Sequence, residues 1–437
     1  MALELSQQQG EGVKAFGAWF REQRFSLDTD VPFFLMGGYA GTGKSSILPN
    51  LIAETGLDLS RISIVAPTGK AVSVIRKKLA AQGLGAIVPT TIHSAIYRYK
   101  PVPIESLEDR VEALKAKVQS SIASNGSPDS ELKETLRLAQ MDLERAYDSA
   151  NPKFQLNVDS NIRNSQLVIV DEASMVGEEI AADLRSFERP VLAIGDPGQL
   201  QPVNARPGFF HRAPDVFLTE VHRQAKDNPI LWFATLLRQG EPIPWGHHDE
   251  RLKVVRPRED RDTYDMERDI QVIVGTNRAR WEINRQSRAI CGFGATGPKA
   301  GELMICTNNS KKIMGLVNGG MMLIEKDVGD LVAGDTSYPV KARDENGNVH
   351  NFIAVQSILE ENYLGKDGSP ADKREIYRAK GKCEHLDWAY AITAHKSQGS
   401  QWDDVVVHDE SEVFREERNK WAYTAATRAA ERLTWVV

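Results

Sequence analysis

Hydrophobic residues along the first half of the chain fall into short unbroken runs separated by segments with a helical spacing. Residues 33–36 and 167–170 are apolar at every position, and residues 62–65 are apolar except for Ser63, which is typical of strands buried on both faces of a parallel sheet. Residues 6–20, before the first run, and residues 71–79, between the second and the third, repeat apolar side chains every three to four positions, as amphipathic helices do. Strands that alternate with helices in this way predict an α/β domain.

A second α/β region is expected from about residue 227 onward. A β-rich insertion at residues 325–383 interrupts it, and this insertion contains Asn346-Gly347, a dipeptide that favours a two-residue hairpin turn. The strands and helices expected in this region outside the insertion are residues 230–238, 271–274, 278–288 and 404–407.

The segment between residues 96 and 164 departs from the α/β alternation. Two apolar stripes with three- and four-residue spacing, at residues 104–122 and 132–146, predict two helices joined by a short turn. Alternating segments at residues 96–101 and 153–158 flank the stripes and predict two strands. We therefore expect a helical hairpin at the tip of a two-stranded stalk.

Length and composition are those of a multidomain globular protein. The chain has 437 residues, of which 41% are hydrophobic and 26% are charged, and it is too long for a single core. Its net charge of −6 excludes a global basic surface, so any nucleic acid would bind in a local groove. The three widely spaced cysteines exclude a CxxC metal site. Because no membrane span or leader is visible, we expect a cytoplasmic protein without membrane contacts.

Residues 38–45 read G-Y-A-G-T-G-K-S and match the P-loop spacing G-x-x-x-x-G-K-[ST]. An expected strand precedes them and an expected helix follows, which is the context that this motif requires. Backbone N–H groups of such a loop surround phosphates, so Lys44 would reach the β- and γ-phosphates and Ser45 would coordinate Mg²⁺. A glycine turn before an ordinary helix is the alternative. We also expect Pro49 to kink or shorten the following helix.

Two further strand ends carry candidate catalytic groups. Asp171 and Glu172 follow the apolar residues 167–170, and two carboxylates beside a P-loop suit phosphoryl hydrolysis. Asp171 would hold Mg²⁺, and Glu172 would orient and deprotonate the attacking water. A solvated surface pair is the alternative. Gln199, in the loop after residues 191–194, is placed to sense a γ-phosphate.

Two arginines and one histidine have both an ordinary and a functional interpretation. Arg223 and Arg428 lie far from the P-loop in sequence, and each is either a surface residue or an arginine finger that reaches across a domain cleft. His93, taken alone, is typical of a structural histidine.

In their order along the chain, these segments resemble the motifs of superfamily 1 helicases, specifically the 1B branch that includes the RecD-like enzymes and the Dda helicase of T-even phages. The matches run from residue 5 to residue 428 and cover nearly the whole chain. The segments that resemble the Q-motif and motifs I, Ia, Ib, II, III, IV, V and VI are residues 5–9, 38–45, 66–71, 91–94, 171–175, 195–203, 220–224, 393–399 and 423–428.

The resemblance implies a role for each matching residue of the nucleotide site. Gln9 would read the adenine edge, and Ser45 with Asp171 would hold Mg²⁺. The residues implied in catalysis are Lys44, Glu172, Gln199, Arg223 and Arg428. The residues implied in nucleotide binding are Gln9, Gly38, Gly41, Thr42, Gly43, Lys44, Ser45 and Gly399.

The resemblance also implies a track for single-stranded DNA, and this changes the interpretation of His93. Backbone donors, hydroxyls and stacked rings share the binding in such a track, so a negative net charge is tolerable. A pin formed around Pro101 and Phe154 would meet the first base pair of a duplex. The residues implied in the track are Pro67, Thr68, Lys70, Thr91, His93, Thr393, His395, Lys396 and Ser397.

Members of this branch have two RecA-like parallel-sheet domains, here expected as domain 1A (1–95 and 165–222) and domain 2A (223–324 and 384–437). A 1B insertion at 96–164 would carry the pin, and an SH3-like β insertion, 2B, would occupy 325–383. The helical hairpin departs from the short pin of the Dda helicase, which leaves open how the pin meets a fork.

The resemblance implies an ATP-dependent DNA helicase that moves 5′–3′ on single-stranded DNA and unwinds duplex, with ATP and Mg²⁺ as cofactors. Single-stranded and forked duplex DNA would be its partners, together with single-strand-binding or replisome proteins in DNA replication, recombination and repair. We expect a monomer. Three other functions stay open: a small-molecule P-loop kinase, which leaves the second α/β region unexplained, a nucleic-acid-stimulated ATPase or translocase, and an ATP-switched clamp without productive unwinding.

Overall fold

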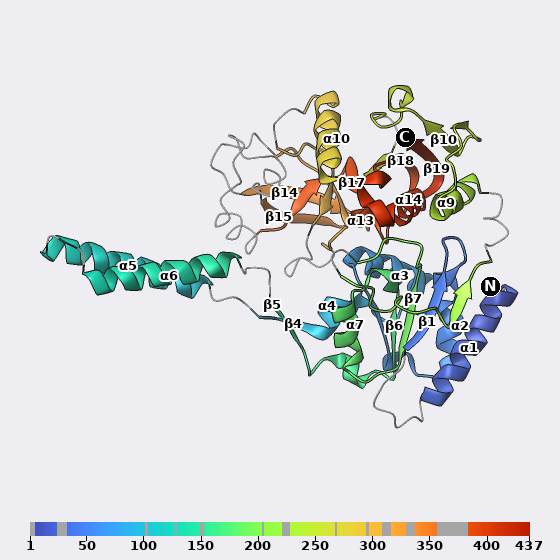
Figure 1. Cartoon of the computed structure of the whole chain (residues 1–437), viewed down its shortest axis with the longest axis horizontal. Coiled ribbons are helices and arrows are strands. Elements are labelled where there is room, and N and C mark those ends of the chain that lie inside the picture. The colour runs from blue at the N-terminus through green and yellow to red at the C-terminus, as the bar shows by residue number, and fades with distance from the viewer. Residues whose placement is uncertain are drawn as a thin grey trace.

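The structure of the protein is a computed structural model (Figure 1). It describes residues 5–23, 33–100, 104–125, 127, 129–148, 153–202, 205–220, 228–266, 269–293, 297–307, 316–328, 337–355 and 383–437. Within these ranges, no helix combines the length and the apolarity that a membrane crossing requires.

The first α/β region forms a six-stranded parallel sheet in the order β3-β2-β6-β7-β1-β8. Its strands are β1 (Phe33–Gly38), β2 (Ile62–Ala66), β3 (Thr90–Thr91), β6 (Leu167–Val170), β7 (Val191–Gly195) and β8 (Val216–Leu218). Its helices are α1 (Gln7–Gln23), α2 (Leu48–Thr55), α3 (Gly69–Ala81), α4 (Ile92–Ile96) and α7 (Glu178–Arg185).

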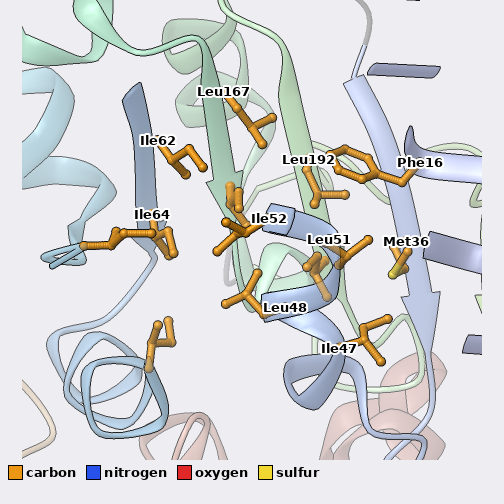
Figure 2. Close-up of a cluster of buried hydrophobic side chains, with 14 of the residues drawn as sticks. Phe16, Met36, Ile47, Leu48, Leu51, Ile52, Ile62, Ile64, Leu167 and Leu192 are labelled. Carbon is orange, nitrogen blue, oxygen red and sulfur yellow. The ribbon is translucent and has the colours of Figure 1, made fainter. Parts of the chain in front are cut away.

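Helices cover both faces of this sheet, as its unbroken apolar strands predict. Along β1, Phe34 and Met36 face the core shared with α1, α2 and α3, whereas Phe33 and Leu35 face the core shared with α4 and α7. Figure 2 shows the first of these cores, in which side chains of α2 pack against β2, β6 and β7. Because all strands are parallel, their carboxyl ends form one edge of the sheet. Polar loops gather at this edge, since helices cover both faces.

The second α/β region forms another six-stranded sheet in the order β17-β11-β18-β19-β10-β9, which is parallel except for the edge strand β9. Its strands are β9 (Gly246–His247), β10 (Leu252–Val255), β11 (Ile270–Val274), β17 (Ala391–Thr393), β18 (Trp402–His408) and β19 (Ala429–Val436). Its helices are α9 (Pro229–Gln239), α10 (Asn277–Ile290), α13 (Ala394–Ser397) and α14 (Arg418–Ala426). Figure 1 shows α13 and α14 where the two sheets meet.

A five-stranded antiparallel sheet is inserted into the second region, in the order β15-β14-β13-β12-β16. It is wider than the expected insertion at 325–383, because three of its strands lie outside those limits. The strands are β12 (Leu303–Cys306), β13 (Met321–Ile324), β14 (Ser337–Asp344), β15 (Val349–Val355) and β16 (Leu386–Trp388).

A helical arm leaves the first region through the antiparallel strands β4 (Tyr97–Lys100) and β5 (Lys153–Leu156). Beyond them, α5 (Ile104–Asn125) and α6 (Ser130–Asp148) pack side by side around Val111, Ala139 and Leu143. The expected helical hairpin on a two-stranded stalk is therefore present, and it projects from the body of the molecule in Figure 1.

Short 3₁₀ turns complete the described elements. They are η1 (Lys44–Ile47), η2 (Leu59–Arg61), η3 (Asn161–Asn164), η4 (Ala173–Met175), η5 (Pro257–Glu259) and η6 (Ser411–Glu417).

Candidate nucleotide-binding site

The P-loop connects β1 to η1 in a conformation that depends on its glycines. Gly41 and Gly43 have φ angles of 79° and 74°, which residues with a Cβ atom rarely adopt. A Cβ atom on Gly38 would lie 2.8 Å from the Thr42 hydroxyl. The turn after the loop is 3₁₀, and α2 begins only at Leu48 with Pro49 in its first turn. Pro49 thus shortens the helix, as the sequence predicts, because proline is tolerated at a helix start but not further inside.

The Lys44 ammonium group lies folded back over the loop. Its Nζ donates hydrogen bonds to the carbonyl oxygens of Gly38 at 2.7 Å and Tyr39 at 2.9 Å, and it is 3.8 Å from Asp196 Oδ2. These partners neutralise only part of its charge. A bound phosphate can replace them with a charge-assisted hydrogen bond, which is roughly twice as strong as a neutral one.

Gln9 braces the P-loop from α1. Its Nε2 donates to the carbonyl oxygen of Thr42 at 3.0 Å, and its Oε1 accepts from the backbone N–H of Ser6 at 3.0 Å. The side chain is 3% exposed. In this conformation the amide group holds the loop in place, and reading an adenine would require it to exchange these partners.

Asp171 and Glu172 lie at the end of β6, where the backbone of Glu172 is left-handed with φ 53°. Burial raises the pKa of Asp171, against the opposing charges of Lys78 and Lys44. Burial also raises the pKa of Glu172, and the negative charge of Asp171 raises it further. A carboxylate with a raised pKa is a stronger base near neutral pH, as a water-activating group must be.

Asp196, at the end of β7, organises the loop that carries Gln199. It is fully buried and accepts hydrogen bonds from the Gly198 N–H and the Tyr423 hydroxyl, both at 2.9 Å. Gln199 Nε2 lies 3.4 Å from its carboxylate, while Gln199 Oε1 is buried without a hydrogen-bond partner among the described residues. The sequence motif points to Gln199 in this loop, but the position of an acidic residue at a strand end indicates Asp196 equally well.

Arg428 lies in the turn between α14 and β19 of the second domain, and its charge interacts with that of Glu172. Its guanidinium donates to the carbonyl oxygens of Thr424 at 2.9 Å and Ser400 at 3.1 Å. Burial lowers its pKa, and the charge of Glu172 is the largest influence that opposes this. Arg428 is therefore held by its own domain at a position from which its charge acts on the Glu172 carboxylate.

For three predicted site residues, the structure does not describe the position of the side chain. Arg223 and Pro101 lie outside the described residues, and so does the side chain of Phe154. The backbone of Phe154 pairs with Tyr99 in the stalk.

The predicted DNA-binding threonines share one structural role. Thr68, Thr91 and Thr393 each cap the N-terminus of a helix that follows a strand, and each hydroxyl accepts from the backbone N–H three residues further on, at 3.1, 3.2 and 3.4 Å. Two of these helices belong to the first sheet and the third to the second. Helix N-termini favour anions such as backbone phosphates.

The predicted histidines lie beside these caps and contact aromatic rings. His93 is 5.4 Å from the ring of Tyr97, and His395 is 5.6 Å from the ring of Phe414. Burial lowers the pKa of both imidazoles, which favours their neutral forms near pH 7. Each ring can therefore stack or donate one hydrogen bond without carrying a charge.

The remaining predicted track residues differ in accessibility. Pro67 is half-buried, burial lowers the pKa of Lys396, and Ser397 is completely buried with its hydroxyl donating to Ala394 at 2.8 Å. Ser397 thus stabilises α13 in this conformation instead of presenting its hydroxyl to a ligand. Lys70 forms an ion pair with Glu345 in the β14–β15 turn.

Gly399 lies away from the P-loop, against α3. Its φ is 76°, and a Cβ atom there would lie 3.3 Å from the Cβ of Ala71. The structure therefore places this predicted nucleotide-binding residue at the contact between the two sheets.

Two parallel sheets, one with a P-loop at its carboxyl edge and the other with Arg428 in the turn before its strand β19, define a P-loop protein with two RecA-like domains. The family model of the AAA domain matches residues 27–256, and that of the UvrD-like helicase C-terminal domain matches residues 388–436. The chain belongs to the AAA domain family, as a RecD-like member of superfamily 1B.

Two curated proteins are similar in sequence. The ATP-dependent RecD2 DNA helicase of Deinococcus radiodurans is 30% identical over 277 residues, which cover 61% of this chain and 35% of that protein. The RecD subunit of the RecBCD enzyme of Mycolicibacterium smegmatis is 24% identical over 461 residues, which cover 96% of this chain and 71% of that protein. The chain thus spans about a third of the length of the RecD2 helicase.

Solved structures show the same fold. A Bacteroides Pif1 helicase in complex with ADP-AlF3 and single-stranded DNA has a TM-score of 0.51 at 16% identity, over 99% of this chain and 92% of that chain. A Pif1 helicase from work on DNA unwinding at forked double-stranded DNA has the same TM-score and identity, over 100% of this chain and 92% of that chain. The predicted pair of RecA-like parallel-sheet domains is therefore confirmed.

Proposed function

We propose that this protein is an ATP-dependent DNA helicase that moves 5′–3′ along single-stranded DNA and unwinds the duplex ahead of it. The observation that carries the proposal is that one nucleotide site is built from both sheets. The P-loop belongs to the first sheet, and its Ala40 N–H donates to the Tyr423 hydroxyl on α14 of the second sheet at 2.7 Å. Binding and hydrolysis at such a site can change the relative position of the two domains.

The hydrolytic groups of the proposal come from both domains. Lys44 would bind the β- and γ-phosphates, and Glu172 would accept a proton from the attacking water. Arg428 would stabilise the charge that develops on the γ-phosphate, and Gln199, whose Oε1 has no partner among the described residues, would report the presence of that phosphate.

The donor set beside the P-loop suits Mg²⁺. The Ser45 hydroxyl and the Asp171 carboxylate are oxygen ligands of the kind that this hard cation prefers together with phosphates and water. When bound, Mg²⁺ would neutralise charge on the phosphates. The Ser45 hydroxyl has no hydrogen-bond partner among the described residues, so it is available for this role.

The proposed track for the strand runs across both domains. Thr68 and Thr91 cap helices of the first domain and Thr393 caps one of the second, so a strand that contacts all three would be gripped by two bodies that move relative to each other. RecD2 and Pif1 proteins, which resemble this chain, are described as DNA helicases or as bound to DNA. The 5′–3′ direction rests on the resemblance to superfamily 1B.

We further propose the domain division 1A (1–95 and 165–222), 1B (96–164) and 2A, with the 2B insertion extended to 303–388 to include all five of its strands. Within 1B, Pro101 and Phe154 would form the pin. Gln9 would read the adenine after releasing its present partners.

The decisive test is the rate of ATP hydrolysis with and without oligo-dT, followed by unwinding of duplexes that carry either a 5′ or a 3′ overhang. We expect strong stimulation by DNA and unwinding of the 5′-overhang substrate only, with Lys44→Ala as the inactive control. Phosphate transfer to a metabolite would instead indicate a kinase, and binding without turnover would indicate a clamp. Stimulated hydrolysis without unwinding would indicate a translocase.

A further inference from the structure

A second guanidinium from the second RecA-like domain lies against the P-loop. Arg238 extends from the last turn of α9, and its Cζ is 3.6 Å from the centre of the Tyr39 ring. Tyr39 is the second residue of the P-loop, and its ring also contacts Phe217 and Tyr423. Arg238 thus reaches from one sheet to the phosphate-binding loop of the other.

The way Arg238 is held leaves its hydrogen-bonding edge available. A guanidinium that stacks on a ring uses its flat face, while its five N–H groups point outward in the plane. Arg238 makes no hydrogen bond and no ion pair with any described residue, and its Nε is buried without a partner. A half-buried guanidinium whose Nε has no partner among the described residues can form charge-assisted hydrogen bonds with an anion that binds beside it.

The surrounding loop makes room for this arginine. A Cβ atom at Gly198 would lie 3.0 Å from Arg238 Cδ and 3.1 Å from Tyr423 Cε1. Residue 198 must therefore be small for Arg238 and Tyr423 to lie together. Gly198 also donates to Asp196, so the arginine packs directly on the loop that carries Gln199.

The neighbours of Arg238 indicate which end of a nucleotide it would meet. Asp196, two residues before Gly198, lies 3.8 Å from Lys44 Nζ, and its charge acts on Glu172. Gln199 Oε1 lies buried and unpartnered in the same loop. The groups for phosphate binding and water activation therefore converge on the side of the P-loop where Arg238 is stacked.

We propose that Arg238 is a further nucleotide-binding residue, whose guanidinium contacts the terminal phosphate of a bound nucleoside triphosphate across the domain cleft. This inference rests on the proposed function, because it requires a nucleotide at the P-loop. A cation at a helix C-terminus also suits the helix dipole, but the dipole does not account for stacking on a loop of the other domain.

The test compares triphosphate with diphosphate binding in the full chain. Affinities for fluorescent mant-ADP and for a nonhydrolysable mant-labelled triphosphate would be measured for the wild type, Arg238→Ala and Arg238→Lys. We expect Arg238→Ala to weaken triphosphate binding at least about tenfold while changing ADP binding less than about twofold. Arg238→Lys keeps a point charge but loses the planar fork of donors, so its affinity for the triphosphate should lie between those of the wild type and Arg238→Ala.

Arg418→Ala provides the matched control, since Arg418 lies on α14 of the same domain and pairs with Glu412 at the surface. Its nucleotide affinities should match the wild type. Equal losses for both nucleotides in Arg238→Ala would mean that the arginine only braces the P-loop through Tyr39, and unchanged affinities would mean that it has no role; either result overturns the inference.

The same measurements separate this inference from the proposed function. If the wild type binds the triphosphate but DNA does not stimulate hydrolysis, the helicase proposal fails while the ratio of affinities still decides the role of Arg238. If DNA stimulates hydrolysis but Arg238→Ala leaves the ratio of triphosphate to diphosphate affinity unchanged, the inference about Arg238 is wrong and the helicase proposal is unaffected. Gly198→Ala offers a second variant, because its Cβ displaces Arg238 without removing the charge, and it should reduce triphosphate affinity in the same selective way.

Discussion

The hydroxyl of Tyr423 accepts a hydrogen bond from the backbone N–H of Ala40 at 2.7 Å, and so joins the second domain to the P-loop of the first. The same hydroxyl donates to Asp196 at 2.9 Å, and Asp196 lies 3.8 Å from the ammonium group of Lys44. One phenol oxygen thus connects the loop that would bind phosphate with α14, the helix that leads into the turn with Arg428.

Replacement of Tyr423 by Phe tests this connection. The variant leaves the Ala40 N–H and the Asp196 carboxylate each short of one buried partner, which costs about 1–3 kcal/mol. We expect kcat to fall about tenfold or more because the domains no longer align Arg428, while KM for ATP changes less than about threefold. Steady-state ATPase assays with oligo-dT measure both constants.

Tyr390→Phe is the matched control for this variant. Tyr390 is another partly buried tyrosine that donates to a carboxylate, Glu302, at 2.9 Å, but it lies away from the nucleotide site. Its kcat should stay near the wild-type value. A normal kcat in Tyr423→Phe would show that the hydroxyl contributes to packing alone.

Glu172→Gln should bind ATP and fail to hydrolyse it. The amide has nearly the same shape as the carboxylate but cannot accept the proton of the attacking water, and a general base contributes about 10²–10⁴ in rate. Equilibrium binding of a mant-nucleotide and single-turnover hydrolysis separate the two steps. Turnover at the wild-type rate would remove Glu172 from its proposed role.

The pH dependence of hydrolysis follows from the raised pKa of Glu172. The base is active when deprotonated, so kcat should fall as the pH decreases through a pKa above the ordinary glutamate value of 4.5. The charge of Arg428 lowers this pKa, so Arg428→Ala should move the acid limb of the pH–rate profile, the part where kcat falls with decreasing pH, to higher pH. The same variant should also reduce the rate by about 10³-fold or more.

Arg428→Lys retains a positive charge and serves as the control for the pH effect. Its acid limb should lie close to that of the wild type even if its rate is low. An acid limb in Arg428→Ala that coincides with the wild-type limb would show that the two groups do not interact.

Glu345→Gln should strengthen binding of single-stranded DNA. In the structure the Glu345 carboxylate pairs with Lys70, which is implied as a DNA contact, and a carboxylate on a lysine competes with a phosphate. We expect the affinity for fluorescein-labelled oligo-dT to rise about two- to fivefold at low salt, less at high salt. Glu412→Gln, at a surface pair elsewhere, should leave the affinity unchanged.

Phe154→Ala tests the proposed pin. Loss of the ring should reduce the number of base pairs unwound per ATP hydrolysed, because a stacking contact with a base contributes about 1–3 kcal/mol. ATP hydrolysis stimulated by oligo-dT should stay near the wild-type rate. A forked duplex unwound with wild-type efficiency would show that Phe154 does not meet the fork.

The parts of the fold that sequence predicts best are those fixed by local chemistry. Apolar runs such as Leu167–Val170 are typical of strands buried on both faces, and the glycines of the P-loop specify its backbone. The sequence does not reveal the full extent of the β insertion, because Met321–Ile324 is as apolar as a core strand, and only its pairing with distant strands assigns it to the five-stranded sheet.

In the candidate site too, sequence predicts the residues of local motifs and misses those that depend on contacts between distant segments. Lys44 and Glu172 are recognised from short motifs, because their function depends on neighbours in the chain. Arg238 and Tyr423 gain their proposed functions from contacts between the two domains, at Tyr39 and Ala40. No local pattern marks such residues, since an arginine near the end of a helix and a buried tyrosine are common in any globular protein.

The stalk has a consequence for the construction of the molecule. Lys100 and Lys153 face each other in the ladder of β4 and β5, so the chain departs for the arm and comes back at neighbouring points. The helical arm is therefore an interchangeable module: it can be lengthened, exchanged or replaced by a tight turn while the two RecA-like domains keep their geometry.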